Sequence, residues 1–164
     1  MKQARGFKLK GEPVKPPLQY TECGLEDVYL LNGYIEHKTP YGTGVSVKHQ
    51  DALHEAIGLH LAGERKLLAG KEIRYLRTHA QMTQAELGKR LGYSAQQVAR
   101  WEKEQSEMPG AADRLLRIIY LERAGQSQKA EELIMKLEEM DDAASSRQCF
   151  RTTKDGWKFA TAAG

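Results

Sequence analysis

The spacing of hydrophobic and polar positions changes along this chain and divides it into two unlike parts. Between residues 20 and 47, β-branched and aromatic residues stand in short runs broken by glycine, asparagine and proline, a pattern typical of strands joined by turns. Helical spacing begins at Gln50 and predicts a helix that ends near Gly63. The apolar face of this helix consists of Leu53, Ala56, Ile57 and Leu61. From residue 71 to about 125 nearly every position fits a helical pattern. We therefore expect an α+β chain, with a small β-hairpin and helix unit at residues 18–63 before an all-α domain at 71–125.

Two turn signals lie inside the first unit. Asn32-Gly33, within VYLLNGYIEHK, separates two β-prone runs, and both residues tolerate the positive φ of a tight turn, so a hairpin is predicted there. TPYGTG, residues 39–44, predicts a second turn before the β-branched residues that follow.

The region after the all-α domain, residues 126–164, is predicted to hold one helix and a tail. The helix is expected over residues 128–140, with one apolar face made of Ala130, Leu133, Ile134 and Leu137. In the tail, Asp155-Gly156 is flanked by aromatic and β-branched residues and predicts another hairpin. Residues 64–70 are interpreted as a linker.

Composition indicates a soluble globular protein with a mild basic excess. Charged residues make up 29% of the chain and the formal net charge is +3, which permits an anionic partner without requiring one. Residues 1–17 carry five basic residues against one acidic residue, and we interpret them as a flexible arm that is either solvated or in contact with DNA phosphates. No run approaches the roughly 20 apolar residues that cross a bilayer, and no apolar signal-peptide core follows the basic start. We expect no membrane partner and a cytoplasmic protein, associated with the nucleoid when bound to DNA.

Two short helices separated by a tight turn are encoded by TQAELGKRLGYSAQQVARWE, residues 83–102. Thr83 and Glu86 have the spacing of a capping box, in which each side chain bonds the other residue's backbone amide. Gly92 allows the first helix to stop sharply because it enters the left-handed region without a Cβ clash. A second box-like start at Ser94 to Gln97 begins the next helix, so the turn is only about three residues long.

The second helix is predicted to present polar side chains to a ligand. If Val98 and Trp101 face the core, then Gln96, Gln97 and Arg100 face outward. Glutamine pairs with adenine N6 and N7, and arginine pairs with guanine O6 and N7, so such a helix suits the DNA major groove. Between residues 64 and 104 nine Lys or Arg stand against five Glu, a net of +4, and the basic excess lies in the part that carries this motif.

The sequence KEIRYLRTHAQMTQAELGKRLGYSAQQVARWEKEQ resembles the helix-turn-helix of Cro/cI and XRE-type repressors, with residues 71–121 covered. The TQAELG opening, the leucine-glycine turn, the serine-started second helix and the RWEKE close carry the resemblance. It implies a lambda-repressor-like fold that binds double-stranded operator DNA, although some domains of this kind mediate only protein contacts. The base-reading positions it implies are Ala95, Gln96 and Arg100. The expected phosphate contacts are Gln84 and Gln97 by resemblance, Thr83 and Ser94 at helix N-termini, and Lys103 and Arg74 by charge.

A homodimer is expected because one recognition helix reads only a few base pairs, and domains of this kind usually act as symmetric pairs on palindromic sites. The segment after Met108-Pro109-Gly110 is more apolar than one helix needs for its own core. The candidate dimer surface combines this segment, through Leu115, Leu116, Ile118 and Ile119, with the predicted helix 128–140, and packing within the protomer is the competing interpretation.

The layout of a small sheet unit before a helix-turn-helix resembles that of MqsA-like antitoxins, through the segment YTECGLEDVYLLNGY. That resemblance implies a toxin or another protein partner for residues 20–62. Zinc-binding members of the family carry paired CxxC motifs, whereas Cys23 and Cys149 stand alone, so we expect no metal and no disulfide. The five histidines are assigned surface or core roles.

These observations favour a sequence-specific DNA-binding regulator, most simply a dimeric autorepressor that reads its operator with residues 94–102. An antitoxin that neutralises a toxin through residues 20–62 is the alternative. A third reading, an enzyme with an appended DNA-binding domain, requires a nucleophile, a metal set or paired acids in residues 20–62. Because Glu22, Glu26 and Asp27 lie close to a predicted turn without further catalytic groups, we expect neither an enzyme nor a cofactor.

Overall fold

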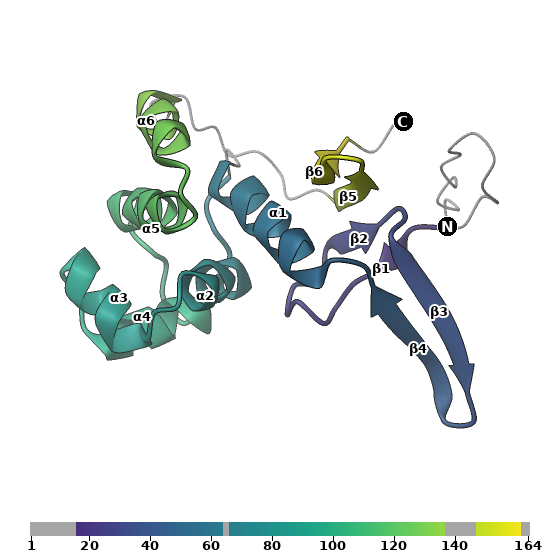
Figure 1. Cartoon of the computed structure of the whole chain (residues 1–164). Helices are drawn as coiled ribbons and strands as arrows, with labels where there is room; N and C mark the ends of the chain where they lie inside the picture. Colours follow the sequence, from purple (N-terminus) through teal and green to yellow (C-terminus); the bar gives the residue numbers. More distant parts are fainter. Residues whose placement is uncertain (1–15, 64–65, 137–146, 162–164) are drawn as a thin grey trace. The chain divides into compact units, whose positions relative to one another are not determined.

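The structure is a computed structural model that describes residues 16–63, 66–136 and 147–161. The chain forms two compact units, one made of Met1–Ile57 with Ser146–Gly164 and the other of Gly58–Ser145. Figure 1 shows their elements in sequence colours. The boundary between the units falls within helix α1 (Gln50–Gly63), which has the start and the end that its apolar spacing predicted.

A four-stranded sheet in the first unit is built from both ends of the chain. Its strands are β1 (Leu18–Gln19), β2 (Val28–Leu30), β5 (Gln148–Thr153) and β6 (Gly156–Ala160), in that spatial order. β1 and β2 are antiparallel, β2 and β5 are parallel, and β5 and β6 are antiparallel. The hairpin predicted at Asp155-Gly156 is therefore confirmed, and it completes a sheet that begins more than 100 residues earlier in the sequence.

The hairpin predicted at Asn32-Gly33 is wrong. β2 already has β1 on one edge and β5 on the other, so no edge is left for the strand that follows. The Asn32 side chain instead bonds Thr152 of β5, accepting from its amide at 2.9 Å and donating to its carbonyl at 3.5 Å. Gly33, with φ of 78°, turns the chain beside Trp157, and a Cβ at this position would lie 2.6 Å from the indole ring.

A separate two-stranded sheet follows this turn. It consists of β3 (Tyr34–Thr39) and β4 (Gly42–Val47), paired antiparallel, and it forms the long ribbon of Figure 1. The turn predicted at TPYGTG is confirmed as the connection between these strands. Most side chains of the ribbon are exposed, and Tyr41 at its tip is 100% exposed.

The core of the first unit joins the four-stranded sheet to the first half of α1. Val28, Leu30, Leu53 and Phe150 are fully buried there. Tyr20 is also buried, and its hydroxyl accepts a hydrogen bond from Gln50 Nε2 at 2.9 Å and contacts His54 Nε2 at 3.0 Å. Burial raises the pKa of Tyr20. His54 thus has a structural role, as the sequence suggested by default.

The second unit is helical. After the end of α1 it contains α2 (Gly70–His79), α3 (Gln84–Leu91), α4 (Ala95–Glu102), α5 (Gly110–Arg123) and α6 (Ser127–Lys136). α2 and α3 each pack on α4 and α5, and α6 packs on α5. The predicted helix 128–140 corresponds to α6, in which Ala130 and Leu133 are buried; its expected end at Met140 lies outside the described residues.

A buried arginine ties the segment before α2 to α5. Arg117 is fully buried and pairs with Asp113 at 2.6 Å, and its other nitrogens donate to the carbonyls of Leu61, Ala62 and Lys66. Asp113 also accepts from the Leu68 amide at 2.8 Å. The charged pair is thereby hydrogen-bonded on both sides, as a buried ion pair must be. The described part of the predicted linker is consequently held against the helical unit.

Candidate nucleic-acid interface

The first helix of the predicted pair begins as the sequence indicated. Thr83 caps α3: its hydroxyl accepts from the Glu86 amide at 3.1 Å, and the Glu86 carboxylate accepts from the Thr83 amide at 2.7 Å. Hydrogen bonds from the Thr83 amide and hydroxyl hold the pKa of the Glu86 carboxyl below its ordinary value. A carboxylate therefore already occupies the N-terminus of α3, where a DNA phosphate would otherwise bind.

The turn between α3 and α4 depends on two glycines. Gly92 has φ of 78° and ends α3 in the left-handed conformation that the sequence predicted. At Gly88 a Cβ would lie 2.6 Å from the Tyr93 carbonyl oxygen, so only glycine allows the backbone of the turn to come this close to α3. Tyr93 in turn meets Trp101 edge-on, with ring centroids 4.9 Å apart. These contacts fix the direction in which α4 leaves the turn.

α4 separates a buried face from a polar one. Val98 and Trp101 are buried, whereas Gln96 and Arg100 are exposed, and Ala95 is half-buried at the N-terminal end. Gln96 and Arg100 are four residues apart and so lie on one side of the helix. The predicted register is confirmed for these residues, whereas Gln97, also predicted to face outward, is half-buried.

The start of α4 only partly follows its prediction. The Ser94 hydroxyl caps the helix by accepting from the Gln97 amide at 3.1 Å. The Gln97 side chain does not return to the Ser94 amide to complete a box; it donates to the Ser106 hydroxyl at 2.9 Å. No acidic residue lies in the first turn of α4, in contrast to α3, so this N-terminus is the better place for a phosphate.

A buried charge network behind the polar face was not anticipated from the sequence. Arg77 of α2 donates to both carboxylate oxygens of Glu102 at 2.5 and 3.1 Å, and both side chains are largely buried. Gln84 Nε2 donates to the same carboxylate at 2.8 Å. The network joins α2, α3 and α4 and orients the Gln84 amide. Sequence spacing gave no signal for it because the residues are 18 and 25 positions apart.

The residues predicted to contact phosphate differ in availability. Arg74 and Lys103 are exposed, and Ser94 is exposed at the N-terminus of α4. Gln84 and Gln97 are half-buried and already hydrogen-bonded. Thr83 is exposed, but its amide and hydroxyl are bound to Glu86.

The exposed charge of this region is strongly basic. Among residues 66–104, six exposed side chains are basic and two are acidic. The basic residues are Lys71, Arg74, Lys89, Arg90, Arg100 and Lys103; the acidic residues are Glu86 and Glu104. Pairing of Glu72 with Lys66 and of Glu102 with Arg77 neutralises the other acids, so the exposed surface favours a polyanion.

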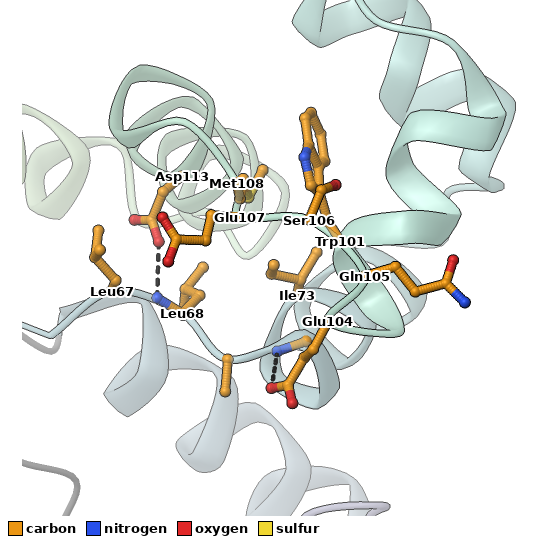
Figure 2. A pocket seen from close by; sticks show the side chains of 12 residues that line it. Leu67, Leu68, Ile73, Trp101, Glu104, Gln105, Ser106, Glu107, Met108 and Asp113 are labelled. Carbon is orange, nitrogen blue, oxygen red and sulfur yellow. Dashed lines mark hydrogen bonds between the residues drawn. The ribbon is translucent and has the colours of Figure 1, made fainter.

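A pocket of about 510 Å³ adjoins the C-terminal end of α4 (Figure 2). The segment before α2 and the loop after α4 form its walls, and the Gly70 amide donates across it to Glu104 Oε1 at 3.1 Å. Glu107 adds a second exposed carboxylate. Trp101 also lines the pocket, and its buried Nε1 has no hydrogen-bond partner in the described part of the chain. Because the charged side chains of its lining are acidic, this pocket does not extend the surface predicted to contact phosphate.

The four residues of the predicted dimer surface do not share one environment. Leu115 is 38% exposed, and Ile118 and Ile119 are half-buried. Leu116 is 0% exposed and belongs to the core of its own protomer, which leaves the other three available on α5.

Comparison with known proteins supports this assignment of the helices. A family model described as a helix-turn-helix matches residues 73–110, which span most of α2 and all of α3 and α4, and reach the first residue of α5. Neither the curated proteins nor the solved structures gave a match. The segment is a helix-turn-helix of the Cro/cI (XRE) type, and this class supports a DNA-binding regulator that acts on double-stranded DNA. The MqsA-like layout of the whole chain is not confirmed.

Metal ligands, cysteine thiols and apolar helices mark other classes of functional site. No three His, Cys, Asp or Glu side chains gather there in a way that would hold a metal ion. Cys23 Sγ donates to the Tyr20 carbonyl at 3.2 Å, and Cys149 is buried in β5; burial raises the pKa of both thiols. No helix among the described residues is long and apolar enough to cross a membrane.

Proposed function

We propose that this chain is a dimeric, sequence-specific repressor that binds a palindromic operator in its own promoter. It is a binding protein, not an enzyme, and acts in the cytoplasm. The observation that carries the proposal is the two-sided arrangement of α4, with Val98 and Trp101 buried and Gln96 and Arg100 exposed on one polar side. A helix held in this way by its neighbours is suited to the major groove.

The contacts follow from the chemistry of each side chain. Arg100 donates to guanine O6 and N7, Gln96 pairs with adenine, and the small Ala95 leaves room for a thymine methyl group. Ser94 and the amides at the start of α4 receive a phosphate. Arg74 and Lys103 add charge along the backbone, and Gln84 and Gln97 add amide donors.

Two copies are required because a single α4 covers only a few base pairs. Leu115, Ile118 and Ile119 on α5 supply an apolar contribution to the contact between them. The twofold axis of such a pair matches the symmetry of a palindrome.

Neutralisation of a toxin through residues 20–62 is the second candidate function. It is favoured by the exposed β3–β4 ribbon, on which the apolar side chain of Ile35 is 48% exposed and that of Tyr41 100% exposed. Growth rescue of cells that express the product of a neighbouring gene tests it: rescue by the full chain and by Arg100→Ala alike would establish neutralisation independent of DNA.

Binding of the purified chain to its own upstream promoter, against scrambled DNA of equal length, tests the repressor function directly. We expect preference for the promoter and a steep loss of affinity between two salt concentrations, because phosphate contacts release counterions. Equal and weak binding to both DNAs would remove the autorepressor proposal. Lys129→Ala, which removes one exposed charge on α6, is the matched control for Arg100→Ala in this assay.

A further inference from the structure

The strand β4 has a free edge with backbone groups that point away from β3. The Lys48 amide donates to the Gly33 carbonyl at 2.9 Å, in line with the register of the β3–β4 ladder. Antiparallel pairs alternate between hydrogen-bonded and non-hydrogen-bonded, so the pairs that include Ser46, Gly44 and Gly42 are the bonded ones. The amides and carbonyls of Thr43, Val45 and Val47 therefore face outward. Within the described residues no other strand lies on that side.

The two edges of the ribbon are protected differently. On β3 the outward backbone groups belong to Tyr34, Glu36 and Lys38, and two of these three side chains are charged. β4 has the sequence GTGVSV and contains neither a charge nor a proline. Charged residues and proline are the usual means by which an edge strand is kept from pairing. The edge of β4 is thus open to another strand, whereas that of β3 is guarded.

We propose that β4 pairs antiparallel with β4 of a second copy of this chain, about a twofold axis at Val45. In this register Val45 faces Val45 of the second copy, and Thr43 faces its Val47, which gives three hydrogen-bonded pairs and about six ladder hydrogen bonds. A shift of one residue would set outward groups against inward ones, and a shift of two would lose one of the three pairs.

The side chains of β4 suit this register. Thr43, Val45 and Val47 share one face, so each β-branched side chain meets another across the new pair, an arrangement that stabilises sheets. On the other face Gly44 meets Ser46, and neither is bulky. Glu36 lies opposite Val45 on the outer strand, so the two copies of Glu36 are three strand spacings apart, about 14 Å. Salt screens repulsion over that distance.

Across this twofold axis β-branched side chains face one another, Gly44 faces Ser46 and no like charges are brought together, which favours a second copy as the occupant. The inference deepens the proposed function by naming a contact between the two copies of the repressor, and it rests on that function only for the need for a pair. Because a six-residue strand buries little area, this contact is best detected by cross-linking.

Disulfide cross-linking of the full-length chain tests the register. Val45→Cys is made in a Cys23→Ser background, which leaves only the buried Cys149 as a second thiol. A hydrogen-bonded antiparallel pair has Cα atoms about 5.5 Å apart, within the range that a disulfide spans. We expect a covalent dimer to form at least about tenfold faster than for Tyr34→Cys, an outward position of β3 that leaves the charges of Glu36 and Lys38 in place, after correction for thiol reactivity toward maleimide.

Backbone and charge variants test the edge itself. Val45→Pro removes an outward amide without removing a bond between β3 and β4, and Glu36→Pro makes the same change on the other edge. We expect the first variant alone to weaken self-association in sedimentation equilibrium. Val45→Lys, which leaves the backbone intact, is expected to do the same and covers the case in which the proline variant fails to fold.

Equal cross-linking of Val45→Cys and Tyr34→Cys, or unchanged self-association of Val45→Lys, would overturn the pairing. Promoter binding is measured on the same samples, and its result tests the repressor proposal independently of the cross-linking result. A chain that binds its promoter but does not cross-link refutes the strand pairing alone, and one that cross-links without promoter preference refutes the repressor alone.

Discussion

Gln84, in the first turn of α3, donates its side-chain amide to the carboxylate of Glu102, the last residue of α4, at 2.8 Å. Because Glu102 also holds Arg77, one carboxylate fixes both a proposed phosphate contact and the end of the proposed recognition helix. The candidate DNA face is therefore supported from behind by buried charge and not by apolar packing alone.

Replacement of Glu102 by alanine should destabilise the helical unit strongly. It leaves the Arg77 guanidinium largely buried without its carboxylate, and loss of one partner from a buried pair costs about 3 to 5 kcal/mol. Urea denaturation would measure the change. Glu107→Ala, at an exposed position, should stay within about 0.5 kcal/mol. A loss below 1 kcal/mol for Glu102→Ala would show that the pair does not hold the unit together.

Arg100→Ala and Gln84→Ala should change DNA binding in different ways. If Arg100 reads a guanine, its loss should cost about 1 to 3 kcal/mol at the operator and relax preference at one base position. Gln84→Ala should weaken binding to all sequences more evenly. Affinities for an operator library with single base changes would separate the two patterns, and a uniform loss for Arg100→Ala would exclude base reading by this residue.

The capping carboxylate of Glu86 predicts a pH dependence of stability. Its pKa in the folded state lies below its ordinary value of 4.5, so its contribution is present above that value and is lost as the pH falls through the folded-state pKa. Glu86→Gln should therefore be less stable than the parent chain at neutral pH, and the difference should vanish in acid. Thermal melts from pH 7 down to pH 3 would check this, and a difference that persists at the acid end would contradict the capping role.

Phe150→Ala should unfold the first unit selectively. Phe150 is fully buried in β5 and meets Phe159 edge-on, and removal of such a side chain costs about 3 to 5 kcal/mol. Because the helix-turn-helix lies in the other unit, promoter binding at low temperature should survive. Hydrogen exchange resolved along the chain would show which unit opens, and early opening of α3 and α4 would contradict the division.

The helix-turn-helix was readable from the sequence because its signals are local. Thr83, Gly92 and Ser94 mark the helix ends within one short segment, residues 83–94, and Val98 with Trp101 sets the register of α4. The sheet of the first unit is harder to predict from the sequence because its strands pair over long sequence distances. Asn32-Gly33 has the local chemistry of a hairpin turn, but β5 occupies the edge of β2 that such a hairpin would need.

The candidate site shows the same contrast. Exposure of Gln96 and Arg100 followed from helical periodicity, whereas the Arg77–Glu102 pair joins residues from different helices and left no local pattern. The apolar run of α5 likewise does not reveal that Leu116 is buried while Leu115 is exposed. Helical periodicity shows which residues share a face of the helix, but it does not say which face another element of the protein covers.

The parallel pairing of β2 with β5 has a consequence for the order in which the protein is made. During synthesis the strand at residues 28–30 leaves the ribosome long before its partner at 148–150, whereas every helix of the helix-turn-helix emerges in between. The DNA-binding unit can thus fold on a nascent chain whose first unit still lacks two of its four sheet strands. A chain halted by premature termination would keep the proposed recognition helix but lose the completed sheet, so translation to the last strands decides whether the two units are ever present together.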